Sequence, residues 1–336
     1  MSNPEDADQT GEAVTGQTAA ASREAPYSSA ELAGTTSSIA RLSNGERVES
    51  AEIAQLGADY WTPERMSRAI PITGPGGGLA PDPTKSPFAL ATGLSGSTPS
   101  AAAIASAANA LADEGLQLAA TITESAVVGK VYFHNPSTGL DYMASASALN
   151  STSKQLVITA GHCVHGGKGG TWMTNWVFIP RYRSGVRPFG TFSAKQFRTF
   201  DAWINNSDLG RDVAMVTTFP LNGNKVVDVV GGNGLNWNFP RNVDVTILGY
   251  PSNFNGGEIQ QWCQGGTSDG GGYTIKIGCN FGGGSSGCPW LMSFNNATGI
   301  GQVDGVMSTL DSAGVNRSSY FDDAVKAMFD AQGSVT

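Results

Sequence analysis

The segment from Cys279 to Trp290, with the sequence CNFGGGSSGCPW, contains two adjacent serines among glycines. Such a glycine run does not favour a regular strand or helix. It is typical of backbone that adopts positive φ or that another group approaches closely. A serine that acts as a nucleophile needs a neighbouring base, usually histidine, and a third group that orients this base. Ser285 and Ser286 are therefore both candidate nucleophiles of a hydrolase.

The positions of the histidines restrict the possible folds. The chain has three histidines, at positions 134, 162 and 165, and all of them precede the two serines. The sequence GGSSG fits the nucleophile elbow of an α/β-hydrolase centred on Ser285, but that fold places its histidine after the serine. His162 follows the apolar run QLVITA and lies in a turn of small residues, which makes it the candidate base. We expect His165 to be a turn or surface residue and His134 to lie at a strand end.

Two chain orders of the acid remain possible, before or after His162. Asp141 is the nearest acid before it. Asp212 begins the apolar run DVAMVTTF, where a carboxylate is costly to bury unless it accepts hydrogen bonds. An imidazole N–H would supply such a bond, whereas Asp208 lies in the polar turn NSDLGRD and is expected to be solvated or to cap the turn. We therefore prefer Asp212.

These candidates lie in three motifs whose sequences and order resemble the chymotrypsin-like serine peptidases: TAGHC at 159–163, DVAMV at 212–216 and GGSSGCPW at 283–290. The GYP and GGEIQQWC sequences and the C-terminal helix resemble the secreted bacterial and fungal branch related to V8-type glutamyl endopeptidases. The resemblance covers about residues 123–331. It implies two packed antiparallel β-barrels with the active site in the cleft between them.

The resemblance also implies a role for each candidate residue. Ser286 occupies the nucleophile position of the Gly-x-Ser-Gly pattern, and Ser285 does not. His162 would remove the proton from Ser286 and pass it to the leaving amine, while Asp212 holds the histidine tautomer. The backbone N–H groups of Gly284 and Ser286 would form the oxyanion hole. The implied reaction is peptide-bond hydrolysis through an acyl-enzyme, with no metal or organic cofactor.

By the same resemblance, two stretches should line the substrate pocket: Asn280, Phe281, Gly282, Gly283, Val306, Met307, Ser308 and Thr309. Asn280 stands where a pocket for basic residues would have aspartate. Met307 falls near the histidine position of glutamyl endopeptidases, and no histidine follows position 165. We therefore expect a preference for small or apolar substrate residues.

The four cysteines allow three disulfide pairings. The family's usual partner of the cysteine after the histidine is missing, and Ala144 stands near its place. From the resemblance we expect a Cys163–Cys288 bridge that ties the histidine loop to the serine loop, and a second bridge, Cys263–Cys279. The alternative is that Cys288 is a small buried residue.

The composition divides the chain near residue 122. Residues 1–122 contain 14 acidic and 6 basic side chains, which accounts for the whole net charge of −8. This part is rich in Ala, Ser, Gly and Pro, so we expect it to be mostly disordered or dependent on the rest of the chain. Ser285 replaces the aspartate that pairs with a new N-terminus in many animal members of the family. We therefore predict that residues 1–122 are a removable propeptide or linker that keeps the precursor inactive.

Residues 123–336 should form the peptidase domain. Short β-prone runs separated by turns favour a barrel or sandwich. We place the first barrel at about 125–222, the second at about 235–318 and a C-terminal helix at about 319–331. A composition without excess basic charge does not favour nucleic-acid binding, and no apolar window is long enough to span a membrane.

The resemblance implies a secreted monomer that acts on proteins or peptides, although the sequence shows no signal peptide at its start. One alternative is a catalytically inactive binding or adhesion protein on the same fold. Another is a narrow regulatory protease with a single protein target.

Overall fold

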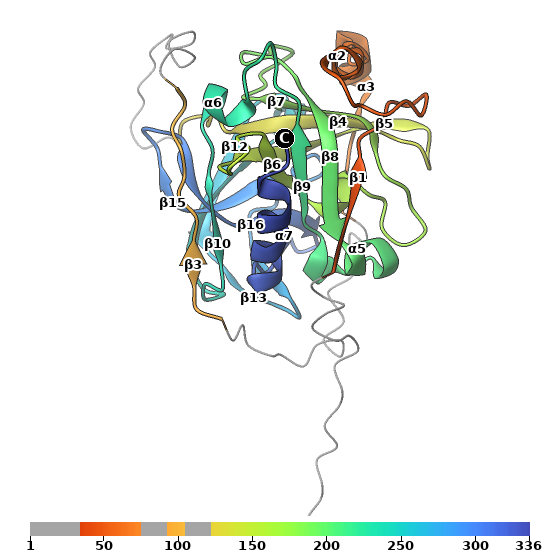
Figure 1. The fold of residues 1–336 in the computed structure, drawn as a ribbon. Coiled ribbons are helices and arrows are strands. Elements are labelled where there is room, and N and C mark those ends of the chain that lie inside the picture. Colours follow the sequence, from red (N-terminus) through yellow and green to blue (C-terminus); the bar gives the residue numbers. More distant parts are fainter. Residues whose placement is uncertain (1–33, 75–92, 105–121) are drawn as a thin grey trace, which may run out of the picture.

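The structure, a computed structural model, describes residues 34–74, 93–104 and 122–336. Its strands form two mainly antiparallel sheets that lie side by side (Figure 1). The predicted all-β fold of two packed barrels is confirmed. Residues 1–33, 75–92 and 105–121 of the predicted pro-region lie outside the described residues.

The first sheet closes into a barrel because β8 pairs with both β7 and β9. Alternating apolar side chains of its strands form the larger hydrophobic core. The barrel strands are β4 (Val128–Asn135), β5 (Leu140–Leu149), β6 (Leu156–Thr159), β7 (Thr174–Pro180), β8 (Phe192–Phe200) and β9 (Ala214–Thr218).

The second sheet has nine strands and curls into a half-barrel. A separate cluster, which includes Ile247, Trp290 and Met307, fills it. The strands from the peptidase part are β10 (Gly234–Trp237), β11 (Asp244–Gly249), β12 (Gln261–Gly266), β13 (Ser268–Gly271), β14 (Thr274–Ile277), β15 (Pro289–Asn295), β16 (Ile300–Leu310) and β17 (Asn316–Ser319).

The C-terminal helix, α7 (Asp323–Gly333), packs against β8, β9 and β10 (Figure 1). Asp322 caps it by accepting hydrogen bonds from the N–H groups of Ala324 and Val325, so the cap is an aspartate and not one of the preceding serines. The remaining helical turns are short: α5 (Asp201–Asn206), α6 (Val226–Val230), η1 (Gly161–Cys163), η2 (Leu209–Arg211) and η3 (Asn255–Gly257). Among the described residues, no helix is long and apolar enough to cross a membrane.

The segment 34–74, within the predicted pro-region, packs against the first barrel. Its elements are β1 (Thr35–Ile39), α2 (Ala51–Asp59), α3 (Pro63–Arg68) and β2 (Ile70–Pro71). β1 adds to β8, and β2 pairs with β5 in parallel. Further along, β3 (Gly96–Ser97) pairs with β10 of the second sheet. The composition did not predict these elements.

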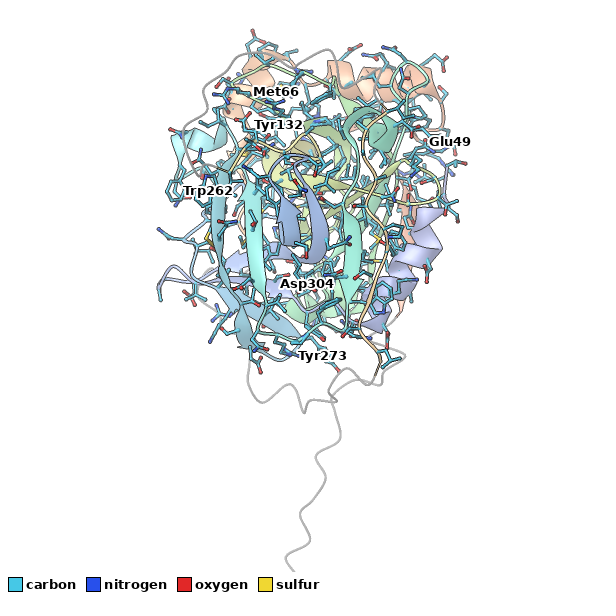
Figure 2. The ribbon with its side chains drawn as sticks, turned by 90° about the vertical axis from the view of Figure 1, so that its left-hand side faces the viewer. Glu49, Met66, Tyr132, Trp262, Tyr273 and Asp304 are labelled. Carbon is cyan, nitrogen blue, oxygen red and sulfur yellow. A yellow bond between two sulfur atoms is a disulfide. The ribbon has the colours of Figure 1, made fainter. Side chains whose placement is uncertain are left out.

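Trp61 anchors the N-terminal segment. Its side chain is fully buried among the tyrosines 132, 182 and 250, and its indole N–H donates to the Asn175 carbonyl at 2.6 Å. Figure 2 shows Met66, which belongs to the same cluster, close to Tyr132. A fully buried aromatic side chain contributes a large apolar area, so Trp61 helps to fix the segment together with Leu42 and Val48, which are buried in the larger core.

One of the two predicted disulfides is present and the other is not. Cys263 and Cys279 are joined, which links β12 to the loop before Asn280. The predicted Cys163–Cys288 bridge is wrong, because both cysteines are free and buried. The two thiols are neighbours, but each is packed as a small apolar side chain, Cys163 in the core of the first barrel and Cys288 in that of the second. Burial, and then the neighbouring Cys163, raises the pKa of the Cys288 thiol.

Candidate active site

His162 and Asp212 form a buried pair at the edge of the first barrel. His162 lies in η1 directly after β6, and Asp212 lies between η2 and β9, which pairs with β6. The Asp212 carboxylate accepts from His162 Nδ1 and from the His162 backbone N–H, each at 2.8 Å. It also accepts from the Ser308 hydroxyl at 2.6 Å. Three donors therefore compensate the burial of this charge.

This arrangement fixes the histidine tautomer. A carboxylate only accepts hydrogen bonds, so His162 Nδ1 carries the proton and Nε2 is left as the acceptor. Nε2 is buried and has no hydrogen-bond partner among the described residues. An unpaired, correctly oriented imidazole nitrogen of this kind can act as a general base.

Activity should rise with pH above the ordinary histidine range. Burial on its own would lower the pKa of His162, but the charges and hydrogen bonds of Asp212 and Cys163 together outweigh burial and raise this pKa well above 6.5. Below the raised pKa, His162 is protonated and cannot accept a proton. The rate of covalent labelling by a fluorophosphonate, measured against pH, should therefore show its rising limb above pH 6.5. A rising limb centred below pH 6.5 would contradict the pairing of His162 with Asp212.

Ser286 lies in a tight turn between β14 and β15. Gly284 adopts φ +87°, and a Cβ atom there would lie 2.6 Å from the Tyr250 carbonyl oxygen, so the position requires glycine. The Ser285 hydroxyl points back into the turn and donates to the Gly282 carbonyl at 2.7 Å. Ser285 therefore holds the turn together, while the Ser286 hydroxyl is directed elsewhere.

Ser145 of β5 connects this turn to the first barrel. Its hydroxyl donates to the Gly284 carbonyl at 2.8 Å and accepts from the Tyr250 N–H at 2.9 Å. Its backbone N–H donates to the Ser286 carbonyl at 2.8 Å. Ser145 is fully buried, so it holds the backbone of Gly284 and Ser286, the two residues whose N–H groups are the predicted oxyanion-hole donors. Sequence analysis did not identify it.

Replacing Ser145 by alanine should lower both stability and turnover. The change leaves a buried carbonyl and a buried N–H without partners, which costs about 1–3 kcal/mol. A displaced Gly284 N–H should lower kcat about tenfold with little change in KM. Urea unfolding and peptide-hydrolysis kinetics measure both effects.

Ser147→Ala is the matched control, because Ser147 lies on the same strand, is equally buried and accepts from Asn233 Nδ2 at 2.6 Å. It should lose stability and keep kcat. Equal losses of kcat in both variants would contradict the positioning role of Ser145.

The predicted pocket residues lie around the same turn but are tightly packed. Phe281 and Met307 belong to the buried core of the second barrel. The Phe281 backbone exchanges two hydrogen bonds of 2.9 Å with the Asn316 side chain, which sequence analysis did not identify. Among the other predicted pocket residues, Val306, Ser308 and Thr309 are buried and Asn280 is exposed. The Ser308 hydroxyl donates its hydrogen bond to the Asp212 carboxylate and does not line an open pocket wall.

The remaining candidates occupy other places. His134 and Asp141 pair at 2.8 Å on the β4–β5 hairpin, where Tyr60 and Arg65 of the N-terminal segment join them. Asp208 caps η2 by accepting from the Gly210 N–H, as expected for a turn acid. His165 is buried and not at the surface, because its ring packs against Trp172.

The comparisons with known proteins agree with this geometry. No family model matches the sequence, and a search of curated proteins gives no match. A crystal structure of the protease Anisep from Arthrobacter nicotinovorans is 31% identical, with a TM-score of 0.58 over 63% of this chain and 97% of that one. A thermostable serine protease, AL20, from an extremophilic microorganism is 28% identical, with a TM-score of 0.59 over 63% of this chain and 99% of that one. A Glu endopeptidase, at 16% identity and a TM-score of 0.52 over 67% of this chain and 99% of that one, shares the fold.

Proposed function

Because the chain belongs to the chymotrypsin-like serine peptidases, we propose that it is an endopeptidase that cleaves proteins or peptides through Ser286, His162 and Asp212. The observation that carries this proposal is the buried His162–Asp212 pair, whose free Nε2 is the only unused polar atom of the pair. The Ser286 turn packs against the histidine loop, since a Cβ atom on Gly287 would lie 2.9 Å from the Ala160 backbone nitrogen.

In the proposed mechanism, His162 Nε2 removes the proton of the Ser286 hydroxyl as its oxygen attacks the substrate carbonyl carbon. The Gly284 and Ser286 N–H groups stabilise the resulting oxyanion. The tetrahedral intermediate then collapses, the imidazolium donates its proton to the leaving amine, and an acyl-enzyme remains. Water, deprotonated by the same histidine, releases the acid product. Asp212 stabilises the imidazolium throughout.

The same proposal includes the location and maturation of the protein. We propose that it is secreted as a monomeric precursor and that residues within 1–122 are a removable propeptide. The Cys263–Cys279 disulfide supports secretion, because such bonds persist in oxidising compartments. Packed Phe281 and Met307 support a preference for small or apolar substrate residues at the cleft.

Peptide-library cleavage tests the activity. We expect the protein, once the proposed propeptide has been removed, to produce new peptide termini with a narrow set of residues before the cut, and the Ser286→Ala variant to produce none. Cleavage that persists in Ser286→Ala would contradict the assigned nucleophile. A folded protein that cuts no peptide, with or without its N-terminal segment, would favour a catalytically inactive binding protein on the same fold.

A further inference from the structure

The segment of residues 70–74 lies across the candidate active site. The Ile72 carbonyl oxygen accepts from the Gly284 N–H at 2.8 Å, the predicted oxyanion-hole donor. The Ser286 hydroxyl donates to the same oxygen at 3.3 Å. On the other side, the Ile72 N–H donates to the Met143 carbonyl of β5 at 3.0 Å. We propose that residues 70–74 are a built-in inhibitor of the cleft, with the Ile72 carbonyl in the place of a substrate carbonyl.

This inference rests on the proposed function of Ser286 and adds how the site is kept inactive. A serine hydroxyl carries one hydrogen. While Ser286 donates it to Ile72, it cannot donate it to His162 Nε2, which is unpaired among the described residues. General-base activation needs that second hydrogen bond. The bound segment therefore occupies the oxyanion hole and also uncouples the nucleophile from its base, so it is held without being cleaved.

The segment is held in place by contacts before residue 70. Trp61 is buried in the tyrosine cluster of the first barrel, and Arg187 donates to its carbonyl at 2.6 Å. Arg65 pairs with Asp141 at 3.0 Å and lies over the ring of Tyr60. Because these anchors lie on the same chain, the inhibitor segment has a high effective concentration at the cleft.

Gly74 shows how closely the segment fits. A Cβ atom on Gly74 would lie 2.0 Å from the Ser308 carbonyl oxygen, which belongs to the strand beside Asp212. Real Cβ atoms do not come this close to backbone, so any residue other than glycine must shift the backbone at position 74 away from Ser308. Gly74→Ala therefore displaces the inhibitor without altering a barrel residue.

The experiment compares the full chain with Gly74→Ala and with Gly266→Ala. At Gly266, an added Cβ meets only Asp244 Oδ1 at an ordinary distance of 3.5 Å. Two readouts are measured: amide hydrogen exchange at Ile72 and Gly284, and the rate at which a fluorophosphonate labels Ser286. In Gly74→Ala we expect both amides to exchange, and Ser286 to be labelled, at least about tenfold faster than in the full chain. Gly266→Ala should match the unaltered chain.

A second variant, Ile72→Pro, removes the N–H donated to Met143, and with it the exchange readout at position 72. Exchange at Gly284 and labelling of Ser286 should both become faster, as in Gly74→Ala. Equal labelling rates in the unaltered chain and both variants would overturn the inference while leaving Ser286 as the nucleophile. Amides at Ile72 and Gly284 that exchange freely in the unaltered chain would overturn it as well. Faster exchange in Gly74→Ala with no labelling of Ser286 at all would instead overturn the proposed catalytic function, and the inhibition with it.

Discussion

Replacing His162 by alanine should lower kcat for peptide hydrolysis by about 10⁶-fold, the loss found when a serine hydrolase loses its histidine. Without Nε2, no described group can remove the Ser286 proton, and only oxyanion-hole binding remains. The measurement is hydrolysis of a fluorogenic peptide in the Gly74→Ala background, where the cleft is expected to be open.

His165→Asn is the matched control for this variant. His165 is also buried and lies three residues away, and its Nδ1 accepts from the Gly167 N–H at 3.1 Å, a bond that the asparagine oxygen can replace. This variant should keep kcat within a few-fold. Similar losses in both variants would mean that the loop as a whole, and not the His162 imidazole, supports the activity.

Replacing Asp212 by asparagine should lower kcat by about 10⁴-fold at neutral pH. An amide NH₂ facing His162 Nδ1 favours the tautomer whose proton is on Nε2, and that nitrogen can then no longer accept from Ser286. The rising limb of the pH profile should also move to lower pH, because Asp212 contributes most among the groups that raise the pKa of His162. Steady-state kinetics between pH 5 and 9 record both changes.

Asp208→Asn serves as the control for Asp212→Asn. Asp208 lies four residues before Asp212 and accepts only from the Gly210 N–H, a hydrogen bond that asparagine can retain. A loss of activity in Asp208→Asn as large as in Asp212→Asn would show that the assignment of the acid is wrong.

The sequence predicted the fold and the His162–Asp212 pair, because both depend on local motifs. The role of Ser286 as the nucleophile stays a prediction. TAGHC, DVAMV and GGSSG each combine a strand or turn with the residue that it presents, and their order restricts the fold. Of the two predicted disulfides, Cys263–Cys279 is present and Cys163–Cys288 is not. Sequence position alone does not show that the two thiols belong to separate cores.

The contacts that sequence reasoning missed link distant parts of the chain. Ser308 meets Asp212 across 96 residues, and Ile72 meets Ser286 across 214. Ser145 is one of several small residues on β5, and nothing in its sequence context distinguishes it from Ser147. The N-terminal segment was underestimated because a low apolar content suggests little burial. Its few apolar residues, among them Leu42, Val48 and Trp61, are nevertheless buried in the two clusters of the first barrel.

The most direct test of the central claim is to locate a fluorophosphonate adduct by peptide mass spectrometry on the full chain and on Gly74→Ala. An assembled triad makes one serine far more nucleophilic than any other. We predict a single adduct on Ser286, which forms faster in Gly74→Ala and is absent from the His162→Ala variant. An adduct on Ser285, or a folded Gly74→Ala protein that takes up no label, would contradict the assignment of Ser286, His162 and Asp212 as a catalytic triad.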